Sequence, residues 1–286
     1  MVKPVNPLMV LSTPRAGSSA MGKLLSDSGI KQFEFGDFQK QAASEFNENG
    51  YFEDSTMNLC LDNLIRFTFG NRNSFIFNKG MFPNKEAMLT NLRTNWDSVY
   101  DLDTHSVSFP EHYSNRFEEF TGHNWDVWGL TRMNIGHKWH RAYSRAGVES
   151  GKKAYEKFVS IMEKFEVQTN VFIKDPRLIY LLPLVDRDIT AIIVRRSEEN
   201  ILKSMRNHYG PNLFTDNRLF EDWVSNHFNY AIQPQTFDEF YRTYHLFEDY
   251  ARNNFEVHFM NFEDLHNEKI LVEKSKELQV SLQWKV

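Results

Sequence analysis

The sequence predicts an α/β protein with a central parallel sheet flanked by helices. Short apolar segments typical of strands recur at residues 5–13, 170–175, 189–194 and 255–262, and segments with helical periodicity separate them. Strands that alternate with helices form parallel sheets through right-handed crossovers. The 286 residues contain no repeat, linker or low-complexity tract, so we expect a single domain spanning 1–286.

The N-terminal third begins with the buried strand at 5–13, which ends in a turn at Pro14 and a helix from about Ser18. A turn and a short strand are expected within 28–38. Further apolar spacing predicts a helix at 56–69 and a strand at 73–80, and the helix that begins at 18 carries an apolar stripe formed by Ala20, Met21, Leu24 and Leu25.

Residues 84–150 show no clean period after an initial helical segment. We interpret them as an irregular, largely helical insertion that could cap an active site. Order returns after this insertion. The expected helices lie at 151–168, 176–186, from Ser197, at 216–232, at 235–254 and at the C-terminus, with Pro176 at the first position of its helix.

Composition excludes several classes of protein. Apolar residues make up 41% and charged residues 25%, as in ordinary globular proteins. The net charge of −5 argues against nucleic-acid binding, which needs a strongly basic face. Cys60 is the single cysteine, so no intramolecular disulfide can form, and no window approaches 18 apolar residues. We therefore expect a cytoplasmic protein with neither nucleic-acid nor membrane partners.

The segment "TPRAGSSAMGKLL" (13–25) nearly matches the G-x-x-x-x-G-K-[ST] phosphate loop, but Leu24 replaces the Ser or Thr that would hold Mg²⁺. The apolar stripe places Gly22 and Lys23 in the second turn of the helix. The phosphate loop is therefore predicted to be the earlier "PRAGSS". There the backbone N–H groups of Ala16, Gly17, Ser18, Ser19 and Ala20 would form an anion cradle at a helix N-terminus, with Arg15 adding a cation.

This strand–"TPRAGSS"–helix segment resembles the 5′-phosphosulfate loop of the sulfotransferases that use 3′-phosphoadenylyl sulfate (PAPS). The family's 3′-phosphate motif is a strand-ending Arg followed eight residues later by Ser. Arg196 and Ser204 match it in "ITAIIVRRSEENILKSMRNH". A guanidinium fork and a hydroxyl suit a terminal phosphate. The resemblance covers roughly residues 8–38 and 170–268, and it implies a P-loop-like sulfotransferase fold.

The segment "IKDPRLIYLLP" fits the same family's central strand, whose final Lys contacts the transferring group; here that residue is Lys174. In the animal cytosolic branch a general-base His stands two residues later, where this chain has Pro176. The "KDPR" form looks like the bacterial and carbohydrate-type branches, in which a Glu after the second strand often serves as base. Glu34, or failing that Asp37, lies in that region, and His105 and His112 in the insertion are alternatives.

The resemblance implies an enzyme that transfers the sulfuryl group of PAPS to a hydroxyl or amine of a small acceptor and releases adenosine 3′,5′-bisphosphate. Arg15 and Lys174 would stabilise the transferring group, so no metal would be required. Phenols, sugars and other hydroxylated metabolites remain open as acceptors. Two other hypotheses remain: a metal-dependent P-loop kinase or NTPase, and a non-catalytic nucleotide-binding protein with a sulfotransferase fold. The segment "NFEDL", in which Phe262 replaces a Tyr of the family, is expected to be structural.

Overall fold

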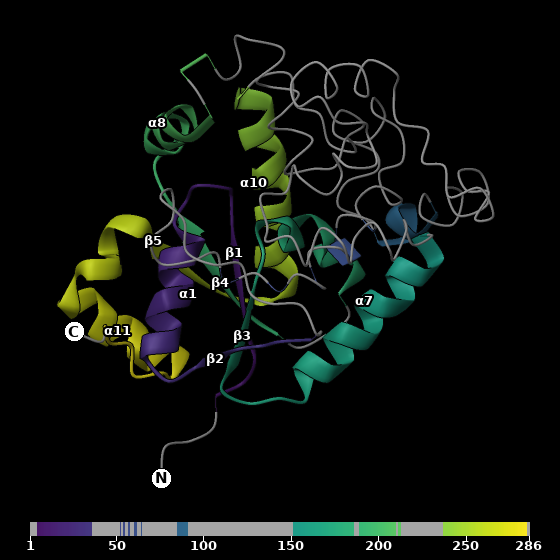
Figure 1. Cartoon of the computed structure of the whole chain (residues 1–286), viewed down its shortest axis with the longest axis horizontal. Helices are drawn as coiled ribbons and strands as arrows, with labels where there is room; N and C mark the ends of the chain where they lie inside the picture. The colour runs from purple at the N-terminus through teal and green to yellow at the C-terminus, as the bar shows by residue number, and fades with distance from the viewer. Residues whose placement is uncertain are drawn as a thin grey trace, which may run out of the picture.

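The computed structural model describes residues 5–35, 52, 54, 57, 60, 61, 64, 85–90, 151–185, 189–209, 211–212 and 237–284. A five-stranded sheet forms the centre of this part of the chain, in the order β2-β3-β1-β4-β5 (Figure 1). All neighbouring pairs are parallel. The α/β class and the parallel sheet predicted from the sequence are therefore confirmed.

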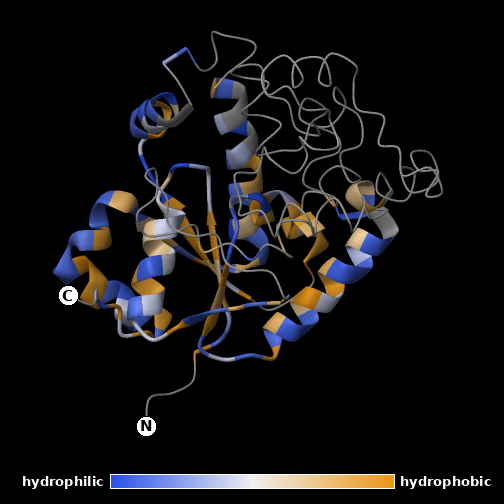
Figure 2. Cartoon of the chain, viewed as in Figure 1, coloured by the Kyte–Doolittle hydropathy of each residue, from blue (hydrophilic) through white to orange (hydrophobic). Residues whose placement is uncertain are grey.

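The strands are short and begin and end close to the expected positions. They are β1 (Leu8–Ser12), β2 (Lys31–Gln32), β3 (Val171–Lys174), β4 (Thr190–Arg195) and β5 (Glu256–Asn261). β1 and β4 are buried along their length, apart from the partly exposed Arg195, whereas β5 at the sheet edge is half exposed. Figure 2 shows an apolar sheet at the centre and helices of mixed hydropathy around it.

Alternate residues of the strands face two separate cores. On one side, Leu8, Val10 and Ile192 pack against α1 (Ser18–Asp27) and α11 (Glu268–Leu278). On the other side, Met9, Leu11 and Ile193 pack against the helices α7 (Gly151–Glu166), α8 (Glu198–Tyr209) and α10 (Phe237–Asn254) and the 3-10 helix η2 (Pro176–Leu184). Figure 1 shows α1 and α11 on one side of the sheet and α7 on the other.

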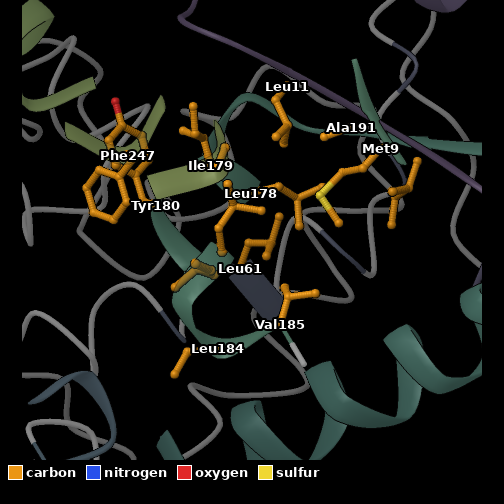
Figure 3. Packing of buried hydrophobic residues seen from close by; sticks show 14 of the residues in the cluster. Met9, Leu11, Leu61, Leu178, Ile179, Tyr180, Leu184, Val185, Ala191 and Phe247 are labelled. Carbon is orange, nitrogen blue, oxygen red and sulfur yellow. The ribbon is translucent and has the colours of Figure 1, made fainter. Parts of the chain in front are cut away.

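The segment after β3 differs from the expected helix at 176–186. It is the 3-10 helix η2, and it contains Pro183, whose nitrogen cannot donate the hydrogen bond that an α-helix needs there. Asp175 caps its start by accepting from the Arg177 N–H, and Pro176 follows as the first helical residue. In Figure 3, Leu178, Ile179 and Tyr180 of η2 lie within the core, and the Tyr180 ring meets Phe247 of α10 edge-on at 5.1 Å.

Several predictions concern residues outside the described part of the chain. These are the strand at 73–80, the helix at 216–232, nearly all of the insertion at 84–150, and with it His105 and His112. Residues 57, 60, 61, 64 and 85–90 are helical, as the apolar spacing predicted. No helix among the described residues is long and apolar enough to cross a membrane.

Candidate phosphate-binding site

The sheet order predicts a ligand-binding crevice at the carboxyl ends of β1 and β4. After β1 the chain crosses through α1 towards β2, whereas after β4 it leaves through α8 and α10 towards β5. Neighbouring parallel strands whose connections diverge in this way leave a crevice at their carboxyl ends, where α/β proteins bind ligands. Ser12 pairs with Val194, so the loop after β1 and the end of β4 meet at the same level of the sheet.

The loop after β1 folds as a tight turn into α1. The Ala16 N–H donates to the Thr13 carbonyl at 3.2 Å, and Gly17 is the N-cap of the helix with φ 104°. Arg15 also has a positive φ, of 68°. The first helical bond runs from the Met21 N–H to the Gly17 carbonyl.

This turn leaves the N–H groups of Ser18, Ser19 and Ala20 without helical partners, as at any helix start. The Ala16 N–H, which was predicted to belong to the anion cradle, instead donates to a carbonyl within the turn. Gly17 itself cannot be replaced without cost, since a Cβ built there would overlap Cδ2 of Phe262.

The two predicted phosphate motifs contact each other. Nε of Arg15 donates to Oγ of Ser204 at 3.1 Å, and Nη1 of Arg196 donates to the carbonyl oxygen of Arg15 at 3.3 Å. Phe262, at the start of the 3-10 helix η3 (Phe262–His266), packs against both: its ring overlies Gly17 and lies 4.5 Å from the Arg196 guanidinium. Residues about 180 positions apart in the sequence thus form one site.

The two consecutive arginines at the end of β4 have different surroundings. Arg195 pairs with the buried Glu248 of α10 and stacks on Phe259 at 3.8 Å. Arg196 turns towards Arg15 and Phe262 instead, and its Nε atom is buried without a hydrogen-bond partner in the described structure. Arg196 is therefore the one of the pair that faces the crevice.

Glu248 holds the α10 side of the site together. Its carboxylate is 2% exposed and accepts from Arg195 and from Arg252, with the Nδ1 atom of His245 at 3.8 Å. Burial alone would raise the pKa of Glu248, but the hydrogen bonds and charges of His245 and Arg195 together lower it below its usual value. The sequence carried a signal for this cluster, since Tyr241, His245, Glu248 and Arg252 recur at the spacing of one helix face.

A cavity of about 490 Å³ opens between the end of β4 and this face of α10. We call it the β4–α10 cavity. Its lining includes Thr13, Arg196, Ser197, Tyr241, Tyr244 and Glu248. Thr13 and Tyr244 were not among the predicted site residues: Thr13 begins the "TPRAGSS" segment but was given no binding role, and Tyr244 lies outside the motifs from which the site was predicted.

The remaining predicted residues lie on the β3 and β2 side. Lys174 ends β3 and is buried at 3% exposure. Glu34 lies two residues beyond Gln32, the last residue of β2, and it is exposed. Asp37 lies outside the described residues. Among the described residues, no group of three or more His, Cys, Asp or Glu side chains could hold a metal ion.

The "KDPR" segment has a structural explanation. Asp175 accepts from Nε of Arg177 at 2.9 Å and from its Nη2 at 2.7 Å, and both side chains are buried. This fork and the cap on η2 fix the turn that directly follows Lys174. The Asp and the Arg therefore orient the end of β3.

Comparison of the chain with models of protein families, with curated proteins and with solved structures found no match.

Proposed function

We propose that this protein is a PAPS-dependent sulfotransferase, which transfers the sulfuryl group of PAPS to a hydroxyl or amine of a small acceptor. The proposal is supported mainly by the contact between the two motifs that resemble this family, through Arg15 with Ser204 and Arg196 with Arg15. A nucleotide with phosphate groups at both its 5′ and 3′ positions needs two anion sites close together, and the proposal assigns both to the carboxyl ends of β1 and β4.

The roles of the loop residues follow from their position. The N–H groups of Ser18, Ser19 and Ala20 and the two serine hydroxyls would bind the 5′-phosphosulfate at the start of α1. Arg196 and Ser204 would bind the 3′-phosphate. Arg15 would lie between the two, because its side chain already reaches Ser204 while its backbone belongs to the β1 loop.

PAPS supplies an activated sulfuryl group, with adenosine 3′,5′-bisphosphate as leaving group. In the transfer the acceptor oxygen forms a bond to sulfur while the bond from sulfur to the 5′-phosphate oxygen breaks. Arg15 and Lys174 would stabilise the negative charge that develops on the leaving oxygen. Glu34 or Asp37 would take the acceptor proton, a role that contributes about 10²–10⁴ in rate.

The kinase or NTPase hypothesis has less support. In that hypothesis Lys23 would reach the phosphates, but in the structure it lies in the second turn of α1 and bonds to Asp27 at 2.5 Å. Gly22 is buried beneath Phe52. These contacts are those of a helix body, which favours "PRAGSS" as the phosphate loop.

The nucleotide preference can be tested by thermal unfolding in EDTA. A ligand that binds only the folded state raises the unfolding free energy by about 2.7 kcal/mol at 100 times its Kd. We expect adenosine 3′,5′-bisphosphate to raise Tm without a metal. Stabilisation by ATP with Mg²⁺ alone would support the kinase hypothesis instead.

Activity is tested by a transfer screen with labelled PAPS over phenols, sugars and amines. Lys174→Ala should abolish the transfer that the wild type shows, while nucleotide stabilisation persists. Unchanged transfer in that variant would contradict the role of Lys174. Nucleotide binding without transfer to any acceptor class would favour the non-catalytic alternative.

The 3′-phosphate contact is tested by Arg196→Ala. Loss of a charge-assisted hydrogen bond should weaken the binding of adenosine 3′,5′-bisphosphate by about 1.5–3 kcal/mol. Adenosine 5′-phosphate, which lacks the 3′-phosphate, should bind almost as it does to the wild type. Calorimetric titration measures both, and an equal loss for the two nucleotides would refute the assignment of Arg196.

A further inference from the structure

Three of the residues that line the β4–α10 cavity each carry a buried polar atom that has no hydrogen-bond partner in the described part of the structure. These atoms are Oγ1 of Thr13, Nε of Arg196 and the hydroxyl of Tyr244. Thr13 is 1% exposed and Tyr244 is 3% exposed. Leaving such a group unpaired costs about 1–3 kcal/mol each, so three around one cavity indicate that a ligand supplies the missing partners.

The three groups come from separate elements. Thr13 follows β1, Arg196 follows β4, and Tyr244 lies in the middle of α10. They do not satisfy one another locally, as residues of a single turn or cap would. They share only the cavity, which is consistent with a binding site built by the tertiary fold.

The chemistry of the three groups selects an anion. Nε of an arginine can only donate a hydrogen bond, and a hydroxyl can donate one. Burial, and after it the neighbouring Glu248, raises the pKa of Tyr244 well above its usual value, so the phenol keeps its proton and remains a donor. Three donors, one of them cationic, match the oxygen atoms of a phosphate or sulfate group.

The charges around the cavity agree with this assignment. The buried carboxylate in the lining, Glu248, is already paired with Arg195 and Arg252. The other two carboxylates of the lining, Asp249 and Glu263, are exposed and therefore solvated. Arg196 has no carboxylate partner among the described residues, so the buried part of the cavity carries an excess of positive charge.

We propose that Thr13 and Tyr244 are ligand-binding residues, which together with Arg196 hold a phosphate or sulfate group in the β4–α10 cavity. If the proposed function holds, that group is the 3′-phosphate of the nucleotide, and recognition of it extends to a hydroxyl on α10. The oxyanion site itself depends only on the three donors. Free phosphate and a nucleotide phosphate share this chemistry, and the probes below separate them.

Tyr244→Phe and Thr13→Val remove each hydroxyl with little change in shape. Tyr180→Phe is the matched control, because Tyr180 is equally buried but does not line the cavity. Each variant is titrated calorimetrically with adenosine 3′,5′-bisphosphate, adenosine 5′-phosphate and inorganic phosphate, and Tm is measured without ligand. A tyrosine hydroxyl that only stabilised the fold would lower Tm when removed, whereas an unpaired one would not.

We expect Tyr244→Phe to keep or raise the Tm measured without ligand. The same variant should bind adenosine 3′,5′-bisphosphate about tenfold more weakly, as for the loss of a hydrogen bond to a charged group. Thr13→Val should also weaken the binding of the bisphosphate, and Tyr180→Phe should not. Adenosine 5′-phosphate should bind all the variants as it binds the wild type.

The outcomes separate the two proposals. If the wild type binds inorganic phosphate but neither nucleotide, and Tyr244→Phe lowers the affinity for inorganic phosphate, the oxyanion site stands and the proposed function fails. If Tyr244→Phe and Thr13→Val leave the affinity for every phosphate probe at the wild-type value, the assignment of the two hydroxyls is overturned even where PAPS is used. A lower Tm without ligand and an unchanged affinity would overturn it in the same way, by showing a structural role.

Discussion

The β1 loop and the end of β4 both contribute to the candidate site, but the fold holds them in different ways. The β1 loop depends on backbone geometry: a positive φ at Arg15 and Gly17, an internal turn, and the Phe262 ring directly above Gly17. The end of β4 depends on charge, because Glu248 holds Arg195 aside while Arg196 stacks on Phe262. The loop should therefore be sensitive to added volume, and the strand end to pH.

The largest effect is expected from Gly17→Ala. The new Cβ would overlap Phe262 at a residue whose φ is 104°, which combines overpacking with left-handed strain. We expect a loss of about 3 kcal/mol of unfolding free energy, and loss of nucleotide binding as the loop shifts. Urea unfolding and calorimetric titration measure the two.

Gly29→Ala is the matched control. Gly29 also has a positive φ, of 86°, but nothing lies within 4 Å of a Cβ built there. Only the strain should remain, at about 1 kcal/mol, with nucleotide binding intact. Equal losses in the two variants would mean that Phe262 does not constrain the loop.

The fold was more predictable from the sequence than the interior of the site. Apolar runs and turn residues indicated the strands and most described helices because burial and backbone preference are local properties. Arg196 and Ser204 could be grouped because their eight-residue spacing matches the 3′-phosphate motif that this segment resembles. Thr13 and Tyr244 are separated by many residues, and only the fold brings them to one cavity. The nine-residue 3-10 helix η2 was also missed, since an α-helix and a 3-10 helix share much of their sequence pattern.

The second-largest loss of stability is expected from Glu248→Gln, which breaks the charge cluster at the end of β4. Breaking a fully buried pair costs about 3–5 kcal/mol. The Arg195 side chain is 33% exposed, so we expect a smaller loss, of about 2 kcal/mol at pH 7. The binding of adenosine 5′-phosphate, which engages the β1 loop, should change little.

The pH dependence of this variant follows from the lowered pKa of Glu248. A carboxyl with a folded-state pKa below its unfolded-state pKa stabilises the protein above the unfolded value, and this contribution disappears as pH falls through the folded value. The unfolding free energies of wild type and Glu248→Gln should therefore converge below about pH 4.5, the usual value for this group. A difference that stays constant down to pH 3 would contradict the charge-based account.

A third, smaller effect should affect both regions at once. Phe262 contacts Gly17 and Arg196, so Phe262→Leu removes the cation–π contact and part of the packing. We expect a loss of about 1 kcal/mol in stability, together with weaker binding of both nucleotides. Phe262→Tyr keeps the ring and should retain both properties. Normal binding in the leucine variant would show that the two regions are positioned independently of this ring.

The smallest effect is expected from Lys23→Ala, which tests where the phosphate loop ends. Lys23 pairs with Asp27 one helical turn away, and its side chain is 35% exposed. Such a pair contributes about 0.2–0.5 kcal/mol. If "PRAGSS" is the loop, the variant should lose that small amount in urea unfolding and bind adenosine 3′,5′-bisphosphate at the wild-type Kd. A large loss of nucleotide affinity would return Lys23 to the phosphate site and favour a kinase-like loop that extends through Gly22, because only there does a lysine at this position meet the phosphates.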